Sequence, residues 1–187
     1  MISSVALFKN KSGVPVSQLR YSQIIVSLQY LANGTRPNIS FSVSKLARYT
    51  NCPDRTHWSA LDRVLRYLKG TVSLVIHCGR FPVVLEGYSD ARWIAKNSAS
   101  NGCLGYVFTL CGGAVSWKSA KQTLITRYIF EAELCALDTT GINAEWLFGL
   151  LSQLPILSQP LPSIVVYCDN QTTITKVRSR KYNQKTK

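Results

Sequence analysis

Three acidic residues have a sequence context that could bring them together in a catalytic group. Asp90 follows an apolar run in "VVLEGYSD", and Asp169 follows a similar run in "IVVYCD". Glu133 lies in "FEAELCALD", which has the pattern of a helix. Converging carboxylates bind Mg²⁺, a hard cation that prefers oxygen ligands. Two such ions about 4 Å apart can drive phosphodiester hydrolysis, because one activates water and the other stabilises the leaving oxygen.

This chemistry requires that the three carboxylates meet. Neighbouring strands of one sheet can place the carboxylates at their carboxyl ends side by side, and a helix packed on the sheet can add a third. The same residues also have ordinary explanations, since Asp is common in turns and a single helical Glu is usually exposed to solvent. Spacing alone leaves the metal site and these explanations open.

The period of the apolar residues predicts the elements that would carry these acids. From residue 83 the pattern indicates a strand, then a hairpin of "CLGYVFTLC" and "AVSWKSA" around a Gly-Gly turn. A long helical pattern over 129–154 follows and is expected in two pieces around Gly141. After a Pro-rich linker, "SIVVYCDN" is predicted as a strand that ends at Asp169, and another helix begins behind it.

The preceding part of the chain is predicted to be mainly helical. Three helices are expected, over about 18–32, up to about Arg48, and over about 55–69 with Asp54 as its capping residue. "TVSLVIHC", residues 71–78, is predicted as a strand. In the third helix one apolar stripe is expected at helical spacing; it comprises Trp58, Leu61, Val64, Leu65 and Leu68.

The charge of the chain points to a polyanionic partner. The sequence has 187 residues, a formal net charge of +13 and a pI of about 9.7, a balance typical of nucleic-acid binding. Seven of the nine acids lie in residues 81–170, between two basic flanks. Hydrophobic residues make up 46% of the chain and charged residues 17%, which excludes a disordered polar chain. The basic flanks are alternatively solvated faces or tails.

Six cysteines occur, but none forms a C-x-x-C pair, and His57 and His77 do not complete a zinc pattern. Most of the cysteines are expected to be small buried hydrophobes in a reduced setting, the cytoplasm or the nucleus. The N-terminus has too short an apolar run for a signal peptide, and no stretch of about 18 apolar residues predicts a membrane span. No membrane partner is therefore expected.

Several motifs, in their order and spacing, resemble the end of the polyprotein of copia-type LTR retrotransposons. "SLQYLANGTRPNISFSVSKLARYTNCPDRTHWSALDRVLRYLKGT" resembles the stretch after the reverse-transcriptase fingers and palm. "GYSDARW", "GYVFTLCGGAVSWKSAKQT", "EAEL" and "VYCDNQ" resemble the ribonuclease H domain. The resemblance covers nearly the whole chain. It implies a ribonuclease H-like α/β fold, a mixed sheet with flanking helices, preceded by a small helical segment.

The same resemblance implies a function and its residues. In that family the domain cleaves the RNA strand of an RNA/DNA hybrid, and the carried-over catalytic metal ligands are Asp90, Glu133 and Asp169 with two Mg²⁺ ions. Glu133 is preferred to Glu131 because "ELCAL" resembles the family's core. The expected partners are hybrid or other nucleic acid and the rest of a Pol polyprotein. Basic residues expected to contact nucleic acid are Arg63, Arg66, Lys118, Lys121, Arg178, Arg180 and Lys181.

Three departures from the family predict impaired activity. Arg92 stands where the family usually has a second acid, and in a strand it would face the same side as Asp90. The run before the helical Glu is "TRYIF" rather than small and Ser/Thr-rich. The chain ends at "NQKTK", before the family's fourth carboxylate and its final strand and helix. A ribonuclease H-like domain truncated at its C-terminus is therefore expected.

Two other functions remain open. "RVLR" resembles the translocation motif of secreted oomycete effectors, through Arg63, Leu65 and Arg66. Such a protein would enter host cells and suppress defence or cell death by contacts with a host protein, although the same string also suits an amphipathic helix. Nucleic-acid binding without cleavage is the other alternative. The predicted organisation is a lead-in over 1–16, a reverse-transcriptase remnant over 17–80, an incomplete ribonuclease H-like domain over 81–178 and a basic tail over 179–187.

Overall fold

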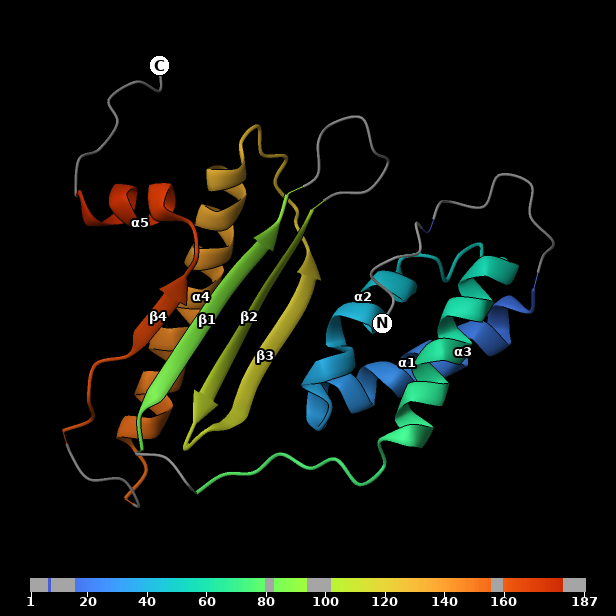
Figure 1. Ribbon diagram of the computed structural model, residues 1–187, viewed down its shortest axis with the longest axis horizontal. Helices are drawn as coiled ribbons and strands as arrows, with labels where there is room; N and C mark the ends of the chain where they lie inside the picture. Colours follow the sequence, from blue (N-terminus) through green and yellow to red (C-terminus); the bar gives the residue numbers. More distant parts are fainter. Residues whose placement is uncertain (1–6, 8–15, 80–82, 94–101, 156–159, 180–187) are drawn as a thin grey trace. The chain divides into compact units, whose positions relative to one another are not determined.

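The computed structural model describes residues 7, 16–79, 83–93, 102–155 and 160–179. It divides the chain into two units, residues 1–77 with 118–121, and residues 78–117 with 122–187. The first is helical and the second is built on a sheet (Figure 1). Of the basic residues predicted to bind nucleic acid, Arg180 and Lys181 lie outside the described residues.

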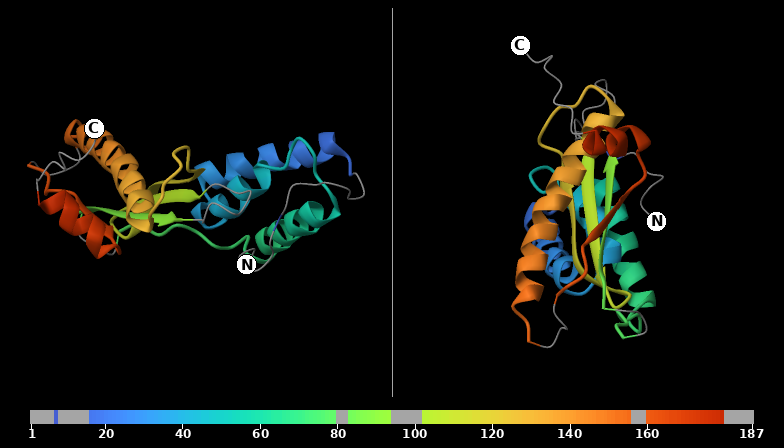
Figure 2. Two further views of the ribbon diagram at one scale, coloured as in Figure 1. Left: turned by 90° about the horizontal axis from the view of Figure 1, so that it is seen from above. Right: turned by 90° about the vertical axis from the view of Figure 1, so that its left-hand side faces the viewer.

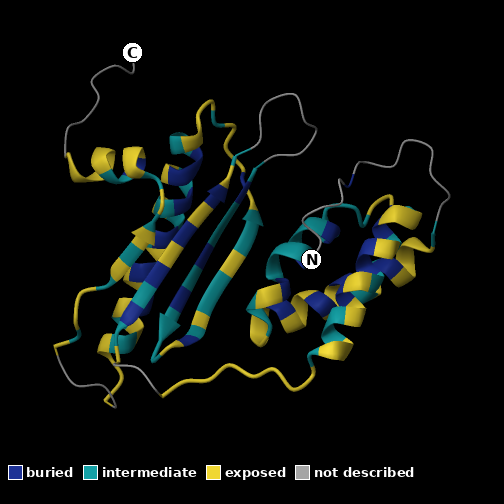
Figure 3. Ribbon diagram, in the orientation of Figure 1, coloured by how far each residue is buried: buried dark blue, intermediate teal, exposed yellow. Residues whose placement is uncertain are grey.

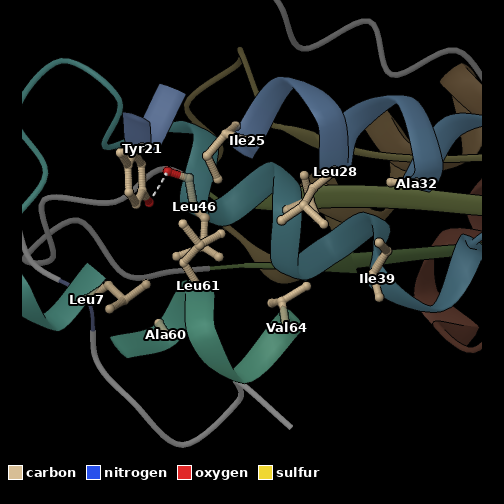
Figure 4. Packing of buried hydrophobic residues seen from close by; sticks show 11 residues of the cluster. Leu7, Tyr21, Ile25, Leu28, Ala32, Ile39, Leu46, Ala60, Leu61 and Val64 are labelled. Atoms are coloured by element: carbon tan, nitrogen blue, oxygen red, sulfur yellow. Dashed lines mark hydrogen bonds between the residues drawn. The ribbon is translucent and has the colours of Figure 1, made fainter. Parts of the chain in front are cut away.

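The helical unit is held together by apolar residues at helical spacing. It contains α1 (Gln18–Gly34), the 3₁₀ helix η2 (Pro37–Ile39), α2 (Ser40–Ala47) and α3 (Arg55–Gly70). The buried residues of α1 are Tyr21, Ile25, Leu28 and Ala32. Their spacing of three and four residues puts them on one face of the helix, which packs against α2 and α3 (Figure 4). The Tyr21 hydroxyl donates a hydrogen bond to the Leu46 carbonyl at 3.1 Å, so the only polar atom of this buried side chain is satisfied.

The start of α3 is fixed by the capping residue that the sequence predicts. The Asp54 carboxylate accepts hydrogen bonds from the backbone N–H groups of Thr56 and His57 at 2.8 and 3.0 Å. Burial alone would raise the pKa of Asp54, but the pKa is lowered overall, first by a hydrogen bond from the Thr56 hydroxyl and then by the two backbone bonds and the neighbouring His57. The apolar stripe predicted on α3 is partly wrong, because Leu65 is 37% exposed. The buried line runs through His57, Ala60, Leu61 and Val64 instead.

The strand predicted over residues 71–78 does not form. These residues are a turn followed by irregular backbone, and their large apolar side chains are exposed: Val72, Leu74, Val75 and Ile76. The run is rich in β-branched residues, which favour strands because they fit a half-buried sheet and not because of their backbone alone. In the part of the chain that the structure describes, this segment pairs with no strand, so its composition alone does not make it one.

The second unit is built on a four-stranded mixed sheet, although the last four residues of one strand, 118–121, are grouped with the first unit. Its strands are β1 (Leu85–Arg92), β2 (Cys103–Leu110), β3 (Gly113–Lys121) and β4 (Val165–Cys168), in the order β3-β2-β1-β4. β1 is antiparallel to β2 and parallel to β4. The predicted hairpin is confirmed, but its turn is Cys111–Gly112 and not the Gly-Gly pair, because Gly113 is already the first residue of β3. Cys111 and Gly112 have φ angles of 52° and 77°, as a two-residue type I′ turn requires.

One long helix covers one face of this sheet (Figures 1 and 2). α4 (Ile129–Ser152) is continuous, so the prediction of two pieces around Gly141 is wrong. A glycine inside a helix costs only about 1 kcal/mol relative to alanine, which the packing of α4 on the sheet can offset. Buried residues of the strands and α4 form a shared core (Figure 3) that contains Leu85, Tyr106, Phe108, Ala144 and Leu147.

The short helix α5 (Gln171–Arg178) follows β4, as predicted. The Asn170 side chain caps it by accepting a hydrogen bond from the Thr173 N–H at 2.9 Å. The described residues form an α/β arrangement of five α-helices and a mixed four-stranded sheet, which is compatible with the expected ribonuclease H-like fold. Within the described residues, no helix has both the length and the apolar character that a bilayer crossing requires.

The cysteines are less buried than the sequence predicts. All six are free thiols, but Cys103 alone is buried. Cys52 and Cys78 are exposed, and Cys111, Cys135 and Cys168 are half-buried. The prediction that most are buried is therefore wrong, because position in an apolar run does not say which face of the run meets the core.

Candidate metal site

Two parallel strands bring Asp90 and Asp169 to the same level of the sheet. β1 and β4 are paired from Glu86 with Val165 to Ser89 with Cys168. The next residue on each strand is therefore Asp90 on β1 and Asp169 directly after β4. The pairing stops here because β4 ends at Cys168, whereas β1 continues to Arg92. Both aspartates are exposed. They lie at the carboxyl ends of parallel strands, where ligand sites of open α/β sheets are typically found.

Helix α4 brings the third acid to the same place. Ala132 and Ala136 on α4 pack with Ala91 of β1 in one buried cluster. Three alanines allow helix and strand to approach closely, and Glu133 is carried into this interface on the second turn of α4. Its side chain is 4% exposed, and the Ala91 N–H donates a hydrogen bond to its carboxylate.

Glu133 has the electrostatic character of a site residue. Burial raises its pKa most, and the negative charges of Asp169 and then Asp90 raise it further, to about 7. The hydrogen bond from Ala91 acts in the opposite direction but is too weak to reverse the shift. One oxygen of the carboxylate, Oε2, is buried without a hydrogen-bond partner. A buried carboxylate with an unpaired oxygen is the state that a cation would relieve.

Cys168, which the sequence predicts only as a small hydrophobe, belongs to the same group. Ligand atoms of Glu133, Cys168 and Asp169 all lie within 4.8 Å of one another. Among the described residues, Asp90 does not belong to this tight group, although its charge is felt by Glu133. The signal for Cys168 was its place directly before Asp169 in "VYCDN".

Glu131, the acid that competed with Glu133 in the sequence, has a different task. Its Oε2 accepts hydrogen bonds from the backbone N–H groups of Arg127 and Tyr128 at 2.7 and 3.3 Å. Both bonds close the N-terminus of α4, where free N–H groups favour a carboxylate. The two acids are only two residues apart but have different roles: Glu131 caps the helix, and Glu133 lies near the other carboxylates.

The predicted basic residues that the structure describes lie on three different elements. The described ones are all exposed: Arg63, Arg66, Lys118, Lys121 and Arg178. Arg63 and Arg66 lie on α3, Lys118 and Lys121 on β3, and Arg178 at the end of α5. Arg92 is the last residue of β1 and is exposed like Asp90, in keeping with two residues on the same side of a strand.

No family model matches the sequence, and no solved structure does. The sequence is 34% identical to the retrovirus-related Pol polyprotein from transposon TNT 1-94 of Nicotiana tabacum, over 92% of this chain. It is 40% identical to the retrovirus-related Pol polyprotein from transposon RE2 of Arabidopsis thaliana, over 80% of this chain. The chain belongs to the copia-type retrovirus-related Pol polyproteins. The resemblance found in its motifs is thereby confirmed.

The match to these Pol polyproteins covers only a small part of them. The chain spans 13% of the TNT 1-94 polyprotein and 10% of the RE2 polyprotein. A different relative is covered almost completely: the secreted RxLR effector protein 161 of Plasmopara viticola is 38% identical over 68% of this chain and 90% of its own length. Pol-like sequence of this kind is thus also similar to a protein that carries the name of an effector.

Proposed function

We propose that this segment of a Pol polyprotein hydrolyses the RNA strand of RNA/DNA hybrids with two Mg²⁺ ions held by Asp90, Glu133 and Asp169. The observation that carries the proposal is the buried Glu133 carboxylate, whose Oε2 has no hydrogen-bond partner and whose pKa is raised by burial, Asp169 and Asp90. Membership in the Pol family supports the substrate class.

The residues present fit Mg²⁺ in kind. Asp90, Glu133 and Asp169 all offer carboxylate oxygens, the ligands that this cation prefers. When bound, the ions supply an activated water and stabilise the leaving oxygen of the phosphodiester. The protein's own contribution is to hold the three carboxylates near one another on β1, β4 and α4. It also keeps Glu133 buried, so that water does not stabilise the negative charge of its carboxylate.

Arg92 weakens this site without removing it. Its guanidinium lies on the same side of β1 as Asp90, two residues away. A fixed positive charge close to a carboxylate competes with Mg²⁺ for the same negative potential. We therefore propose that hydrolysis is impaired, and that a neutral residue at position 92 increases affinity for Mg²⁺.

The substrate would be attracted mainly by charge. The formal net charge of +13 favours any nucleic acid, and such binding weakens as salt displaces the protein from phosphates. Lys118 and Lys121 are exposed on β3, a strand of the sheet that carries Asp90 on β1, and Arg178 is exposed on α5. Selection of the RNA strand would depend on its 2′-hydroxyl groups.

Cleavage of an end-labelled RNA/DNA hybrid tests the proposal. The wild type is expected to give products in Mg²⁺ and none in EDTA, while Asp90→Asn and Glu133→Gln each reduce the rate at least about 100-fold, as loss of an essential charged group does. Glu131→Gln removes the same charge two residues away and should retain the rate. Absence of cleavage by folded wild-type protein at every Mg²⁺ concentration would refute the enzyme and leave salt-sensitive binding to be measured.

A second candidate function is that of a secreted effector. The observations that favour it are the 90% coverage of the effector relative and the exposure of Arg63, Leu65 and Arg66 on α3. An effector would act on a host protein and would need no metal. Suppression of cell death in host tissue by wild-type protein and equally by Asp90→Asn, with loss in a variant whose Arg63 and Arg66 are both Ala, would support this function over the enzyme.

A further inference from the structure

The ligand set at the end of β4 combines hard and soft atoms. Two carboxylate oxygens, from Glu133 and Asp169, and the Cys168 sulfur all lie within 4.8 Å of one another. A thiolate contributes little to binding of Mg²⁺, which is coordinated by oxygen. Thiolate ligands select Zn²⁺ and similar cations, and carboxylates are acceptable partners for them. The composition of the group therefore points to a cation other than the one expected for hydrolysis.

The buried oxygen of Glu133 is an independent indication that something binds here. Glu133 is 4% exposed, and its Oε2 meets no hydrogen-bond donor. Most buried side-chain acceptors have a partner, so an orphaned one needs an explanation. Glu133 is also the residue whose carboxylate contributes to the three-atom group, so a cation bound by the group would supply the partner that this carboxylate lacks.

We propose that Glu133, Cys168 and Asp169 form a binding site for a thiophilic divalent cation of the Zn²⁺ type. Three protein ligands with water in the fourth position are a common arrangement for Zn²⁺. With metal–ligand bonds of about 2.0–2.3 Å, neighbouring ligands of a tetrahedral site are roughly 3.5 Å apart. Small movements of the exposed Asp169 and the half-buried Cys168 are sufficient to reach this distance. The thiol proton leaves to solvent as the metal binds.

The inference rests on the proposed function only in that the two sites share Glu133 and Asp169. A cation held with Cys168 would exclude Mg²⁺ from these carboxylates. Zn²⁺ would then inhibit hydrolysis rather than support it. The test therefore measures binding directly and does not depend on cleavage.

Co²⁺ is a suitable probe because it binds in place of Zn²⁺ at Zn²⁺ sites. It also gives a near-ultraviolet charge-transfer band when a thiolate is one of its ligands. Reduced full-length protein is titrated with Co²⁺ without chelators. One equivalent of Co²⁺ is expected to give the band. Zn²⁺ is expected to abolish the band by displacing Co²⁺, because thiolate ligands select Zn²⁺, whereas a large excess of Mg²⁺ should leave it unchanged. Lack of a band at stoichiometric Co²⁺ would overturn the proposal.

Replacing one cysteine at a time identifies the sulfur that binds the metal. Cys168→Ser should abolish the band, and Glu133→Gln should weaken Co²⁺ binding at least about 10-fold, as loss of a metal ligand does. Cys52→Ser is the matched control, because Cys52 is exposed and lies in the helical unit, and it should leave the band unchanged. Circular dichroism confirms that each variant is folded. A band that survives Cys168→Ser, or disappears with Cys52→Ser, would refute the site.

Asp90→Asn separates this inference from the proposed function. Asp90 is outside the three-atom group, so the variant should retain the Co²⁺ band while losing Mg²⁺-dependent cleavage. If the band is present but neither the wild type nor the variant cleaves the hybrid, the thiophilic site is supported and the nuclease is refuted. If the wild type cleaves the hybrid but gives no band, the nuclease stands and the thiophilic site is refuted.

Discussion

Glu133→Gln should stabilise the protein above pH 7 and have little effect near pH 4. The pKa of Glu133 is raised from 4.5 to about 7 by burial, Asp169 and Asp90. Below pH 4.5 the acid is protonated in both the folded and the unfolded states, so Gln is a close substitute. Between pH 4.5 and 7 the unfolded state has released the proton and the folded state has retained it. Folding stability therefore falls as pH rises through this range.

The size of the effect follows from the two pKa values. One pH unit of difference corresponds to 1.36 kcal/mol, so a carboxyl whose pKa rises from 4.5 to about 7 loses about 3 kcal/mol of folding free energy above pH 7. Gln carries no charge and avoids this loss. A gain of this size is a large part of the usual 5–15 kcal/mol of a domain and is readily measured.

Urea unfolding in EDTA at pH 4, 5.5 and 8 provides the assay, with stability taken from the midpoint and slope. The difference between Glu133→Gln and wild type should grow from near zero to about 3 kcal/mol across this range. Glu131→Gln is the control, because it also removes one negative charge from a chain of net charge +13 but caps α4. Equal curves for the two variants, or a constant difference at all three pH values, would refute the reasoning.

Three further changes test the fold, each followed by thermal unfolding. Asp54→Ala removes the side chain that caps α3 and should cost about 1 kcal/mol; an unchanged midpoint would mean that the cap is not made. Gly141→Ala lies inside α4, where an added Cβ meets no atom within 4 Å, and should stabilise by about 1 kcal/mol; a loss would indicate an unseen contact. Gly87→Ala places a Cβ 2.6 Å from the buried ring of Phe108 and should destabilise by about 1–3 kcal/mol, so a neutral result would show that the ring can move.

Local signals in the sequence predicted most elements correctly. The helices of the first unit have apolar residues at helical spacing and a capping Asp54, and the hairpin has a turn that requires positive φ. These features are set by neighbours in sequence. The strand over residues 71–78 was wrong because a strand needs a partner, and the break at Gly141 was wrong because packing on the sheet outweighs the local cost of glycine.

The candidate site was only partly accessible to the sequence. That Asp90 and Asp169 would be level depends on parallel pairing of β1 with β4, which apolar runs suggest but do not specify. Their roles as metal ligands, and that of Glu133, stay predictions. The proximity of Cys168 could not be predicted, since consecutive residues of a regular strand face opposite sides and it is the end of β4 that lets both contribute.

The exposed segment over residues 71–78 has a consequence for the behaviour of the protein in concentrated solution. It contains no Pro, no Gly and no Asp, Glu, Lys or Arg, and its large apolar side chains face solvent. A run of six or seven β-prone, uncharged residues is the type of segment that pairs with its copy in another molecule and stacks into fibrils. The property that made it look like a strand of this fold would thus appear as aggregation that grows with protein concentration, and a single lysine in place of Val75 should suppress it.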